Sequence, residues 1–333
     1  MTRNQLLAQL HQEYSKMQTE NLYRFEDKTA QLCDAIPNLE ELLVARHSAV
    51  MQGVRFNMTS INKQKNSNAE LSNLMHEYNT KIHALLIENG YPSNALEPEY
   101  HCSICCDSGY VYNPSKQMCQ CLQLALEKRM LETLGLTNNN ETFENFDPSV
   151  FSTEIVMPPN ATQRQFALSW RNACEKYANA YPNTAQRDLL LHGGSGLGKT
   201  YLIHAIAHRL VARGYLPTYT NAYTFFSLAR RAHMENNPDL LSLFLEAPIL
   251  LLDDLGTEPL MQNITVTQLF ILLNERQLAG LHTVISTNLS FSELRERYTE
   301  RVTSRLLDST TVKRMVFLGG DIRKNLHKRG GNT

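Results

Sequence analysis

Residues 193–200 have the order Gly-Gly-Ser-Gly-Leu-Gly-Lys-Thr, which fits the pattern G-x-x-x-x-G-K-[ST]. In this motif a glycine-rich turn follows a strand and opens a helix, and its backbone N–H groups bind phosphate oxygens. The segment Asp-Leu-Leu-Leu-His at 188–192 predicts a short buried strand, and the apolar spacing within 201–213 predicts the helix, whose N-terminus adds partial positive charge. Because both flanking elements are predicted, an ordinary glycine turn is disfavoured. We expect a nucleoside triphosphate to bind Gly193, Gly194, Ser195, Gly196, Leu197, Gly198, Lys199 and Thr200.

Two side chains of this motif and two carboxylates further along have separate expected roles. The ammonium of Lys199 should reach the β- and γ-phosphates, and the hydroxyl of Thr200 should hold Mg²⁺. An apolar run at 249–252 ends in Asp253 and Asp254, as in a buried parallel strand that delivers acids at its C-terminal end. We expect Asp253 to act on Mg²⁺ through water and Asp254 to orient the attacking water. A strand followed by an ordinary turn acid is the alternative.

Polar residues after the next predicted strand extend this site. Asn288 ends the segment Val-Ile-Ser-Thr-Asn at 284–288, which begins within the strand predicted at 281–286, and it is our candidate for a contact with the γ-phosphate, with a turn asparagine as the alternative. The amphipathic pattern at 298–307 predicts a helix with Arg301 and Arg305 four residues apart on one face. Arginines stabilise charge on a transferring phosphoryl group, and a neighbouring subunit can supply them. We expect Arg301 to act in trans, while Arg305 assists it or pairs with acids; a solvated surface charge is the alternative for each.

A second chemical site is predicted where five of the seven cysteines crowd between 102 and 121. A C-x-x-C pair and a C-x-C pair can supply four thiolates to a tetrahedral Zn²⁺, and a site filled by protein ligands is structural. The expected zinc ligands are Cys102, Cys105, Cys119 and Cys121. Cys106 and His101 adjoin the first pair and remain open as substitutes. Redox cysteines or a disulfide are the other interpretations, and a reducing cytoplasm disfavours the disulfide.

The composition is that of an ordinary globular protein. The chain has 333 residues, 42% apolar and 20% charged, and its formal net charge of −1 excludes a polycationic nucleic-acid coat. From 295 to 333, however, ten Lys and Arg stand against four Asp and Glu, which indicates an anion-facing region or a solvated basic tail. We find no apolar run of about eighteen residues and no signal-peptide pattern. We therefore expect no membrane partner and a cytoplasmic location.

Three regions are predicted to position these residues. Residues 1–99 have the helical spacing of a bundle or of a partner-binding face, and 100–135 form the cysteine-rich module with a linking helix. Beyond 136, helical and strand patterns alternate to the end of the chain, which predicts an α/β domain with a parallel sheet covered by helices on both faces. The expected strands are 188–192, 216–220, 248–253, 281–286 and 312–317.

Together these motifs resemble the AAA+ ATPases of the bacterial helicase-loader family (DnaC/DnaI-like), of which the transposon helper IstB is a close relative. The likeness covers roughly 100–318, and the Asp-Asp-Leu-Gly ending and the Glu-Arg-Val-x-x-Arg helix are more specific than the phosphate-binding turn. The residues that carry it are Gly193–Thr200, Leu250–Gly256, Ser286–Asn288, Glu300–Arg305 and the lead-in segment Phe143–Phe146.

The resemblance implies an ATP-switched protein that binds a replicative hexameric helicase and places it on single-stranded DNA, with hydrolysis driving release. It implies that the N-terminal region contacts the helicase and that copies of the chain self-associate in an ATP-dependent ring or spiral. An IstB-like regulator of a transposase on DNA is the alternative, and a nucleotide-gated adaptor with little hydrolysis is a third. The cysteine module and the helical N-terminus favour the loader.

Single-stranded DNA sites combine cations with aromatic or polar groups. In AAA+ initiators and loaders the region around 223–231 faces a pore, so the resemblance makes Arg230 and Arg231 candidates for DNA binding. The alternative is a core role for the neighbouring Phe225 and Phe226 and solvated arginines. Two basic pairs near the end of the chain could also contact phosphate: Arg323 with Lys324, and Lys328 with Arg329.

Overall fold

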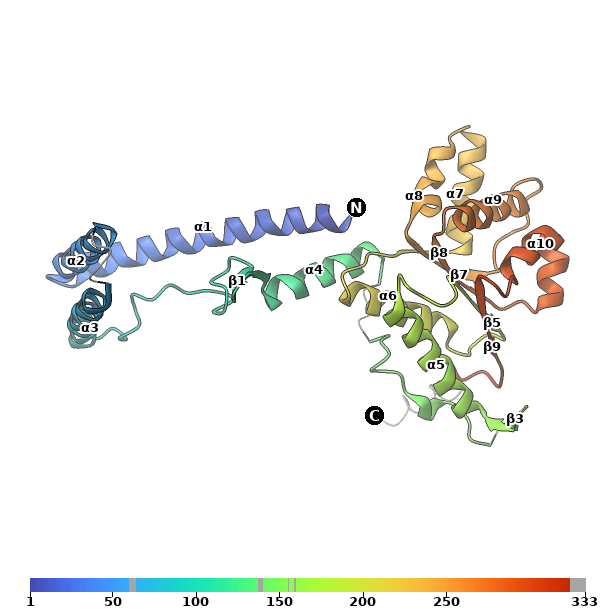
Figure 1. Cartoon of the computed structure of the whole chain (residues 1–333), viewed down its shortest axis with the longest axis horizontal. Coiled ribbons are helices and arrows are strands. Elements are labelled where there is room, and N and C mark those ends of the chain that lie inside the picture. Colours follow the sequence, from blue (N-terminus) through green and yellow to red (C-terminus); the bar gives the residue numbers. More distant parts are fainter. Residues whose placement is uncertain (60–63, 137–139, 155, 159, 324–333) are drawn as a thin grey trace. The chain divides into compact units, whose positions relative to one another are not determined.

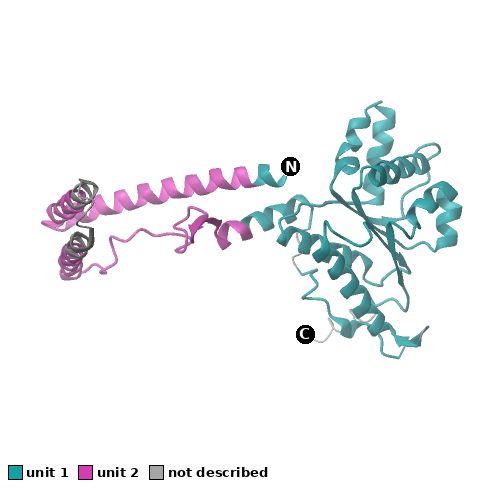
Figure 2. Ribbon diagram, in the orientation of Figure 1, with its two compact units in different colours: residues 1–6, 125–333 teal, residues 7–124 magenta. Residues whose placement is uncertain are grey.

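Figure 1 labels the helices and strands of the computed structural model of this chain. The structure describes residues 1–59, 64–136, 140–154, 156–158 and 160–323, and it does not describe the side chains of residues 53–71. Lys324, Lys328 and Arg329, considered above as phosphate contacts, lie outside the described residues. The chain divides into two compact units, one of residues 1–6 and 125–333 and one of 7–124 (Figure 2). The division into 1–99, 100–135 and 136–333 stays a prediction.

Long helices build the smaller unit, as the sequence predicts. They are α1 (Arg3–Ala35), α2 (Leu39–Thr59) and α3 (Gln64–Glu88). Pro37 separates α1 from α2, because proline lacks the N–H that a helix interior requires. The hairpin of β1 (Tyr110–Tyr112) and β2 (Lys116–Met118) precedes α4 (Gln120–Thr133). The helical core of this unit is small and consists of Leu32, Ile36, Leu39, Ile82, Leu86 and Ala95.

A five-stranded parallel sheet is the centre of the larger unit (Figure 1). Its strand order is β6-β7-β8-β5-β9, so the strand before the phosphate-binding turn lies between two strands that come later in the chain. The central strands are almost continuously apolar because both faces of the sheet are covered. All five predicted strands are confirmed. They are β5 (Asp188–Gly193), β6 (Thr218–Asn221), β7 (Ile249–Leu255), β8 (His282–Thr287) and β9 (Val312–Phe317).

Helices cover both faces of this sheet, which confirms the predicted α/β fold of a parallel sheet between two helical layers. On one face α5 (Gln163–Ala180) packs against α6 (Lys199–Ala212). On the other face α7 (Ala222–Met234) and α10 (Phe291–Leu306) both pack against α9 (Thr265–Leu278). The short elements are two 3-10 turns (Pro148–Val150 and Pro238–Leu241), α8 (Ser242–Glu246), and the pair β3 (Val156–Met157) and β4 (Ala161–Thr162). In the part of the chain that the structure describes, no helix has both the length and the apolar character needed to cross a membrane.

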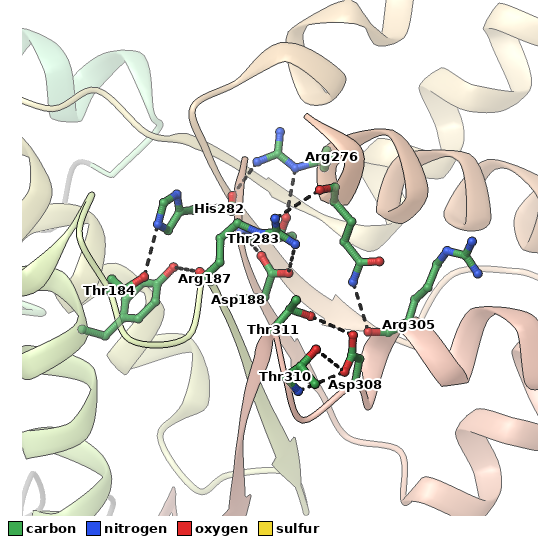
Figure 3. A network of polar contacts seen from close by, with 12 residues as sticks. Thr184, Arg187, Asp188, Arg276, His282, Thr283, Arg305, Asp308, Thr310 and Thr311 are labelled. Carbon is green, nitrogen blue, oxygen red and sulfur yellow. Dashed lines mark hydrogen bonds and ion pairs between the residues drawn. The ribbon is translucent and has the colours of Figure 1, made fainter. Parts of the chain in front are cut away.

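A buried arginine joins several of these elements (Figure 3). The Arg276 side chain on α9 donates to the carbonyl oxygens of Phe244 at 2.7 Å and Ala247 at 2.8 Å. It also donates to Thr283 Oγ1 at 3.0 Å, while the Thr283 N–H donates to Asp188 Oδ1 at 2.9 Å. Burial lowers the pKa of Arg276 to about 10, which still leaves the guanidinium charged at neutral pH. The network therefore fixes α9 and the start of β7 to β8 and β5.

Arg276→Met should lower the free energy of unfolding of the larger unit by at least about 3 kcal/mol, because each buried carbonyl that loses its donor costs about 1–3 kcal/mol. Urea unfolding can be followed by the fluorescence of Trp170, the only tryptophan, whose ring stacks on Phe317 in this unit at 4.3 Å. Arg295→Met, which removes an exposed arginine, is the control and should change stability by no more than about 0.5 kcal/mol. Equal unfolding midpoints for the two variants would contradict the role of Arg276.

Candidate nucleotide site and cysteine cluster

The phosphate-binding turn connects β5 directly to α6. Glycine is required at Gly193, where φ is 143° and a Cβ atom would lie 2.0 Å from the carbonyl oxygen of Phe317 on β9. It is also required at Gly196, where φ is 71° and a Cβ would lie 1.9 Å from Asp321 Oδ1. These close approaches leave room for backbone but not for side chains. The shape of the turn therefore depends on β9 and on the segment after β9, which contains Asp321, as well as on the sequence of the turn itself.

The Lys199 ammonium lies inside this turn and is 5% exposed. It donates to the carbonyl oxygens of Gly193 at 2.6 Å and Gly194 at 2.7 Å, and to Asn288 Oδ1 at 2.7 Å. Burial lowers the pKa of Lys199 to about 8, although the carboxylates of Asp254 and Asp253 oppose the shift. All three acceptors are neutral groups. A phosphate oxygen carries more negative charge, so it would bind the ammonium more strongly than they do.

One serine contacts both acidic residues at the end of β7. The Ser286 hydroxyl donates to Asp253 Oδ1 and accepts a hydrogen bond of 2.8 Å from the backbone N–H of Asp254. The pairing of β7 with β8 shifts register between Leu252 and Leu255, and Asp254 has a φ of 55°. A bulge of this kind redirects a side chain. As a result Asp253 is buried at 3% exposure, whereas Asp254 lines the cleft at the turn.

Asn288 connects the lysine to the second carboxylate. Its Oδ1 accepts from Lys199, and its Nδ2 donates to Asp254 Oδ1 at 3.4 Å. Burial and the nearby Asp253 carboxylate raise the pKa of Asp254 above its ordinary value. The structure thus brings together Lys199, Asp254 and Asn288, three of the side chains that the sequence predicted for phosphate chemistry. Thr200 lies in the first turn of α6 and lines the same cleft.

The cleft at the turn has a volume of about 310 Å³. A second cavity of about 490 Å³ adjoins it and shares Gly198, Tyr201 and Ile322 with it. Phe146 and Phe151 line this second cavity, and their rings stack with 5.6 Å between centroids. An apolar aromatic cavity next to a phosphate site has the properties of a nucleobase pocket. The sequence signal was the lead-in segment Phe143–Phe146, but it did not show that the segment lines the site.

The chain returns to the phosphate-binding turn after β9, which sequence reasoning missed. The backbone N–H of Ile322 donates to the carbonyl oxygen of Gly196 at 3.0 Å, and Arg323 lines the cleft. About 125 residues separate the contacting backbones, so no local pattern could show the contact. Arg323, considered above only as a tail residue, is therefore a candidate contact for the phosphates of a nucleotide bound in the cleft of its own chain.

A chain of polar groups leads from the cleft toward Asp253. The Glu141 carboxylate, which lines the cleft, contacts His204 Nδ1, and His204 Nε2 lies 3.0 Å from the Tyr219 hydroxyl. Burial, followed by the charges of Asp253 and Asp254, raises the pKa of Tyr219, so this hydroxyl stays protonated and can donate to Asp253. Asp253 is thus oriented from one side by Ser286 and from the other by Tyr219. No sequence motif marked these partners.

The arginines predicted to act in trans lie on α10, and neither lines the cleft of its own chain. Their guanidinium groups lie over the Phe270 ring, at 4.7 Å for Arg301 and 4.3 Å for Arg305. Arg305 also donates to Asn274 Oδ1 at 2.7 Å, whereas Arg301 is exposed. Among the residues that the structure describes, no carboxylate forms an ion pair with Arg301. Its exposed head group is therefore available to another molecule.

The arginines predicted to bind DNA lie on α7. Arg230 and Arg231 are both exposed, and Arg231 Nε lies 3.0 Å from Glu235 Oε1. Phe225 and Phe226 are buried in the core, so the interpretation of these two rings as core residues is correct. The aromatic groups next to the arginines are therefore not exposed for stacking on a base. Tyr223 on the same helix is 61% exposed and is the available ring.

Four sulfur atoms meet in the smaller unit, all within 4.8 Å of one another, and they belong to Cys102, Cys105, Cys119 and Cys121. The Sγ atoms of Cys102 and Cys119 are 3.8 Å apart, and those of Cys105 and Cys121 are 3.5 Å apart. Tetrahedral zinc with Zn–S bonds of about 2.3 Å places sulfurs about 3.8 Å apart, so the set fits Zn²⁺. Backbone N–H groups of Cys105 and Ile104 lower the pKa of Cys102 to about 7, which favours the thiolate that binds metal.

The two open substitutes lie outside this sulfur cluster. Cys106 is exposed and its Sγ contacts the carbonyl oxygen of Ser103, while His101 Nδ1 lies 3.3 Å from Asp107 Oδ2. Asp107 is 1% exposed and accepts from the backbone N–H of Cys102 at 2.8 Å. Asn21 on α1 donates to the same carboxylate at 2.6 Å. The cysteine turn is therefore held by a buried aspartate that sequence reasoning did not single out.

Metal analysis of protein purified under reducing conditions should find about one zinc per chain. Cys119→Ser should lose the metal, because serine supplies no thiolate and leaves three ligands. Cys106→Ser is the matched control and should keep the full zinc content, since its sulfur lies outside the cluster. Equal zinc loss in both variants would instead show that Cys106 is a ligand.

Comparison with known proteins identifies relatives of the larger unit. Residues 171–327 match the family model described as IstB-like ATP binding protein. The replicative helicase loader DnaI of Bacillus subtilis (strain 168) is 26% identical over 156 residues, which cover 44% of this chain and 49% of the relative. The chromosomal replication initiator protein DnaA of Thermoanaerobacter sp. (strain X514) is 31% identical over 123 residues, which cover 34% of this chain and 28% of the relative.

Solved structures include similar chains. The crystal structure of the DnaC helicase loader has a TM-score of 0.44 and 19% sequence identity, and the match covers 54% of this chain and 97% of that chain. This chain spans about half or less of the length of the curated relatives named above. All the motifs that predicted nucleotide chemistry, from Gly193 to Arg301, lie within the matched family region. Residues 171–327 are therefore an IstB-like ATP-binding domain, homologous to the helicase loader DnaI and to the initiator DnaA.

Proposed function

We propose that this protein is an ATPase that binds a replicative hexameric helicase and loads it on single-stranded DNA, with hydrolysis driving release. One observation carries the proposal: Lys199, Asn288 and Asp254 meet at the phosphate-binding turn of a domain homologous to the helicase loader DnaI. The cysteine cluster and the long helices of the smaller unit provide a separate surface for a partner. We place this activity in the cytoplasm, where the thiols stay reduced.

The side chains of the cleft support ATP hydrolysis. The turn would hold the triphosphate through its backbone N–H groups, while Lys199 exchanges its neutral acceptors for phosphate oxygens. The Thr200 hydroxyl would hold Mg²⁺, with the Asp253 carboxylate acting on it through water, and Mg²⁺ would neutralise charge on the phosphates. Asp254 lines the cleft and would polarise the attacking water, with Asn288 beside the γ-phosphate. Phe146 and Phe151 would enclose the base.

Assembly and DNA binding complete the proposal. Arg301 is exposed and does not line its own cleft, so it would stabilise the transferring phosphoryl group of a neighbouring copy in an ATP-dependent ring or spiral. Turnover by an isolated chain would accordingly be slow. Arg230 and Arg231 on α7, with the exposed ring of Tyr223, would contact single-stranded DNA through phosphates and one base.

ATP affinity should fall as the pH rises above about 8. The triphosphate binds the ammonium form of Lys199, whose pKa is lowered to about 8, so binding at higher pH must take up a proton. The loss should approach about tenfold per pH unit above that pKa. Calorimetry at pH 7 and pH 9, in buffers of different ionisation enthalpy, measures both the affinity and the proton uptake. Lys199→Arg stays charged and should bind ATP with little pH dependence; a wild-type affinity independent of pH would contradict the assignment.

A pull-down with a purified replicative helicase and single-stranded DNA tests the loading function. Wild-type protein should retain the helicase with ATP and release it as ATP is hydrolysed. Asp254→Asn should still bind ATP but hydrolyse it about 10²–10⁴-fold more slowly, because it lacks the base, and should therefore stay on the helicase. Lys199→Ala, which removes the phosphate contact, is the control that should not respond to ATP. If the helicase is never retained while a transposase–DNA complex is, the IstB-like alternative replaces this proposal.

A further inference from the structure

A buried carboxylate lies just beyond the two acids of β7. Glu258 is 1% exposed and follows Asp254 by four residues. Its Oε2 accepts the backbone N–H of Gly256 at 2.8 Å. The same loop is fixed to Asp254, because the Thr257 hydroxyl donates to the Asp254 carbonyl oxygen at 2.9 Å. Glu258 is thus attached to the loop that holds the acid facing the γ-phosphate position.

The other oxygen of this carboxylate contacts α10. Oε1 accepts from the Tyr298 hydroxyl and lies 3.3 Å from Arg297 Nη2, and Arg297 also donates to the Glu258 carbonyl oxygen. Burial raises the pKa of Tyr298 well above its ordinary value, so its hydroxyl remains a donor. A buried carboxylate without donors would be strongly disfavoured. These contacts therefore fix the loop after β7 to residues 297 and 298.

The residue after Tyr298 has an unusual backbone. Thr299 has a φ of 70° and a ψ of 162°, and it interrupts α10 so that residues before and after it belong to two helical segments. Residues with a side chain rarely adopt this region and keep it only when their surroundings hold it. The second segment begins at Glu300, and the Thr303 hydroxyl holds it to the Thr299 carbonyl oxygen at 2.7 Å. This segment carries Arg301.

We propose that Glu258 is a positioning residue that connects the loop after β7 to the arginine-bearing segment of α10, and so sets the orientation in which Arg301 is presented to a neighbouring subunit. The inference rests on the proposed function, in which Arg301 acts in trans. Without the Glu258 carboxylate, Tyr298 loses its hydrogen bond to the loop and Arg297 keeps only its contact with the Glu258 carbonyl oxygen, so Thr299 can relax toward an ordinary φ. That relaxation rotates the segment from 300 to 306. The arginine that a subunit presents to its neighbour's nucleotide site is thereby linked to the acids of that subunit's own nucleotide site.

The inference predicts a defect in the subunit that donates the arginine, not in the subunit that binds the nucleotide. Glu258→Gln keeps the shape of the side chain but offers one acceptor oxygen in place of two. ATP affinity should therefore stay within about twofold, while hydrolysis in the pure assembly falls at least about tenfold, because a misplacement of about 1 Å can cost about 100-fold. Tyr298→Phe removes one donor only and should show the same effect if Glu258→Gln folds poorly. Glu296→Gln removes an exposed carboxylate of α10 and is the matched control.

Mixed assemblies separate the two roles. Asp254→Asn subunits hydrolyse ATP very slowly but present an intact arginine, so mixing them with Glu258→Gln subunits should restore hydrolysis. Mixing Glu258→Gln with Arg301→Ala should not, because both partners then lack a correctly placed arginine. Restored hydrolysis in the second mixture, or in neither, overturns the inference. The mixture of Arg301→Ala with Asp254→Asn reports on the proposed function alone: if it stays inactive, the trans role of Arg301 fails and this inference fails with it.

Discussion

A buried ammonium and two carboxylates meet at the C-terminal edge of the parallel sheet. Charges in such a place are stable only when each has partners. Here neutral oxygens surround the Lys199 ammonium, the Ser286 hydroxyl donates to Asp253, and the Asn288 amide donates to Asp254. Because Ser286 holds Asp253 inward, Asp254 alone faces the cleft. The neighbouring strand β8 supplies Ser286 and is followed by Asn288, so the strand order of the sheet brings the partners of both acids to one strand end.

The smaller unit is stabilised in a different way. In the part of the chain that the structure describes, its helical core cluster comprises six buried side chains, five near the ends of the long helices and one, Ala95, beyond α3. The cysteine hairpin is held by a cluster of four sulfurs and by the buried carboxylate of Asp107, and not by this hydrophobic core. A tetrahedral metal in that cluster would contribute its binding free energy to folding. Zinc would therefore stabilise the smaller unit, while the larger unit relies on its sheet and its buried polar network.

Sequence patterns predicted what depends on neighbours along the chain. The strands, the phosphate-binding turn, Asp254 and the four clustered cysteines follow from local spacing, and the structure brings each set together. The pattern could not show that Ile322 returns to Gly196, that Phe146 and Phe151 line a cavity, or that Asp107 holds the cysteine turn. These contacts join residues whose meeting depends on the packed fold. Glu258 was hidden for a further reason: a buried acid has no sequence signature of its own.

Contacts of buried polar groups would also orient Arg301 for the trans role proposed above. Arg301 lies over Phe270 and is separated from its own cleft, so its orientation depends on the backbone that carries it. That backbone is strained at Thr299, and such a conformation persists only where its surroundings hold it. In the inference drawn above, Glu258 holds it through the loop that follows Asp254. The short loop between β7 and α9 would therefore connect the nucleotide cleft of one subunit to the arginine that its neighbour receives.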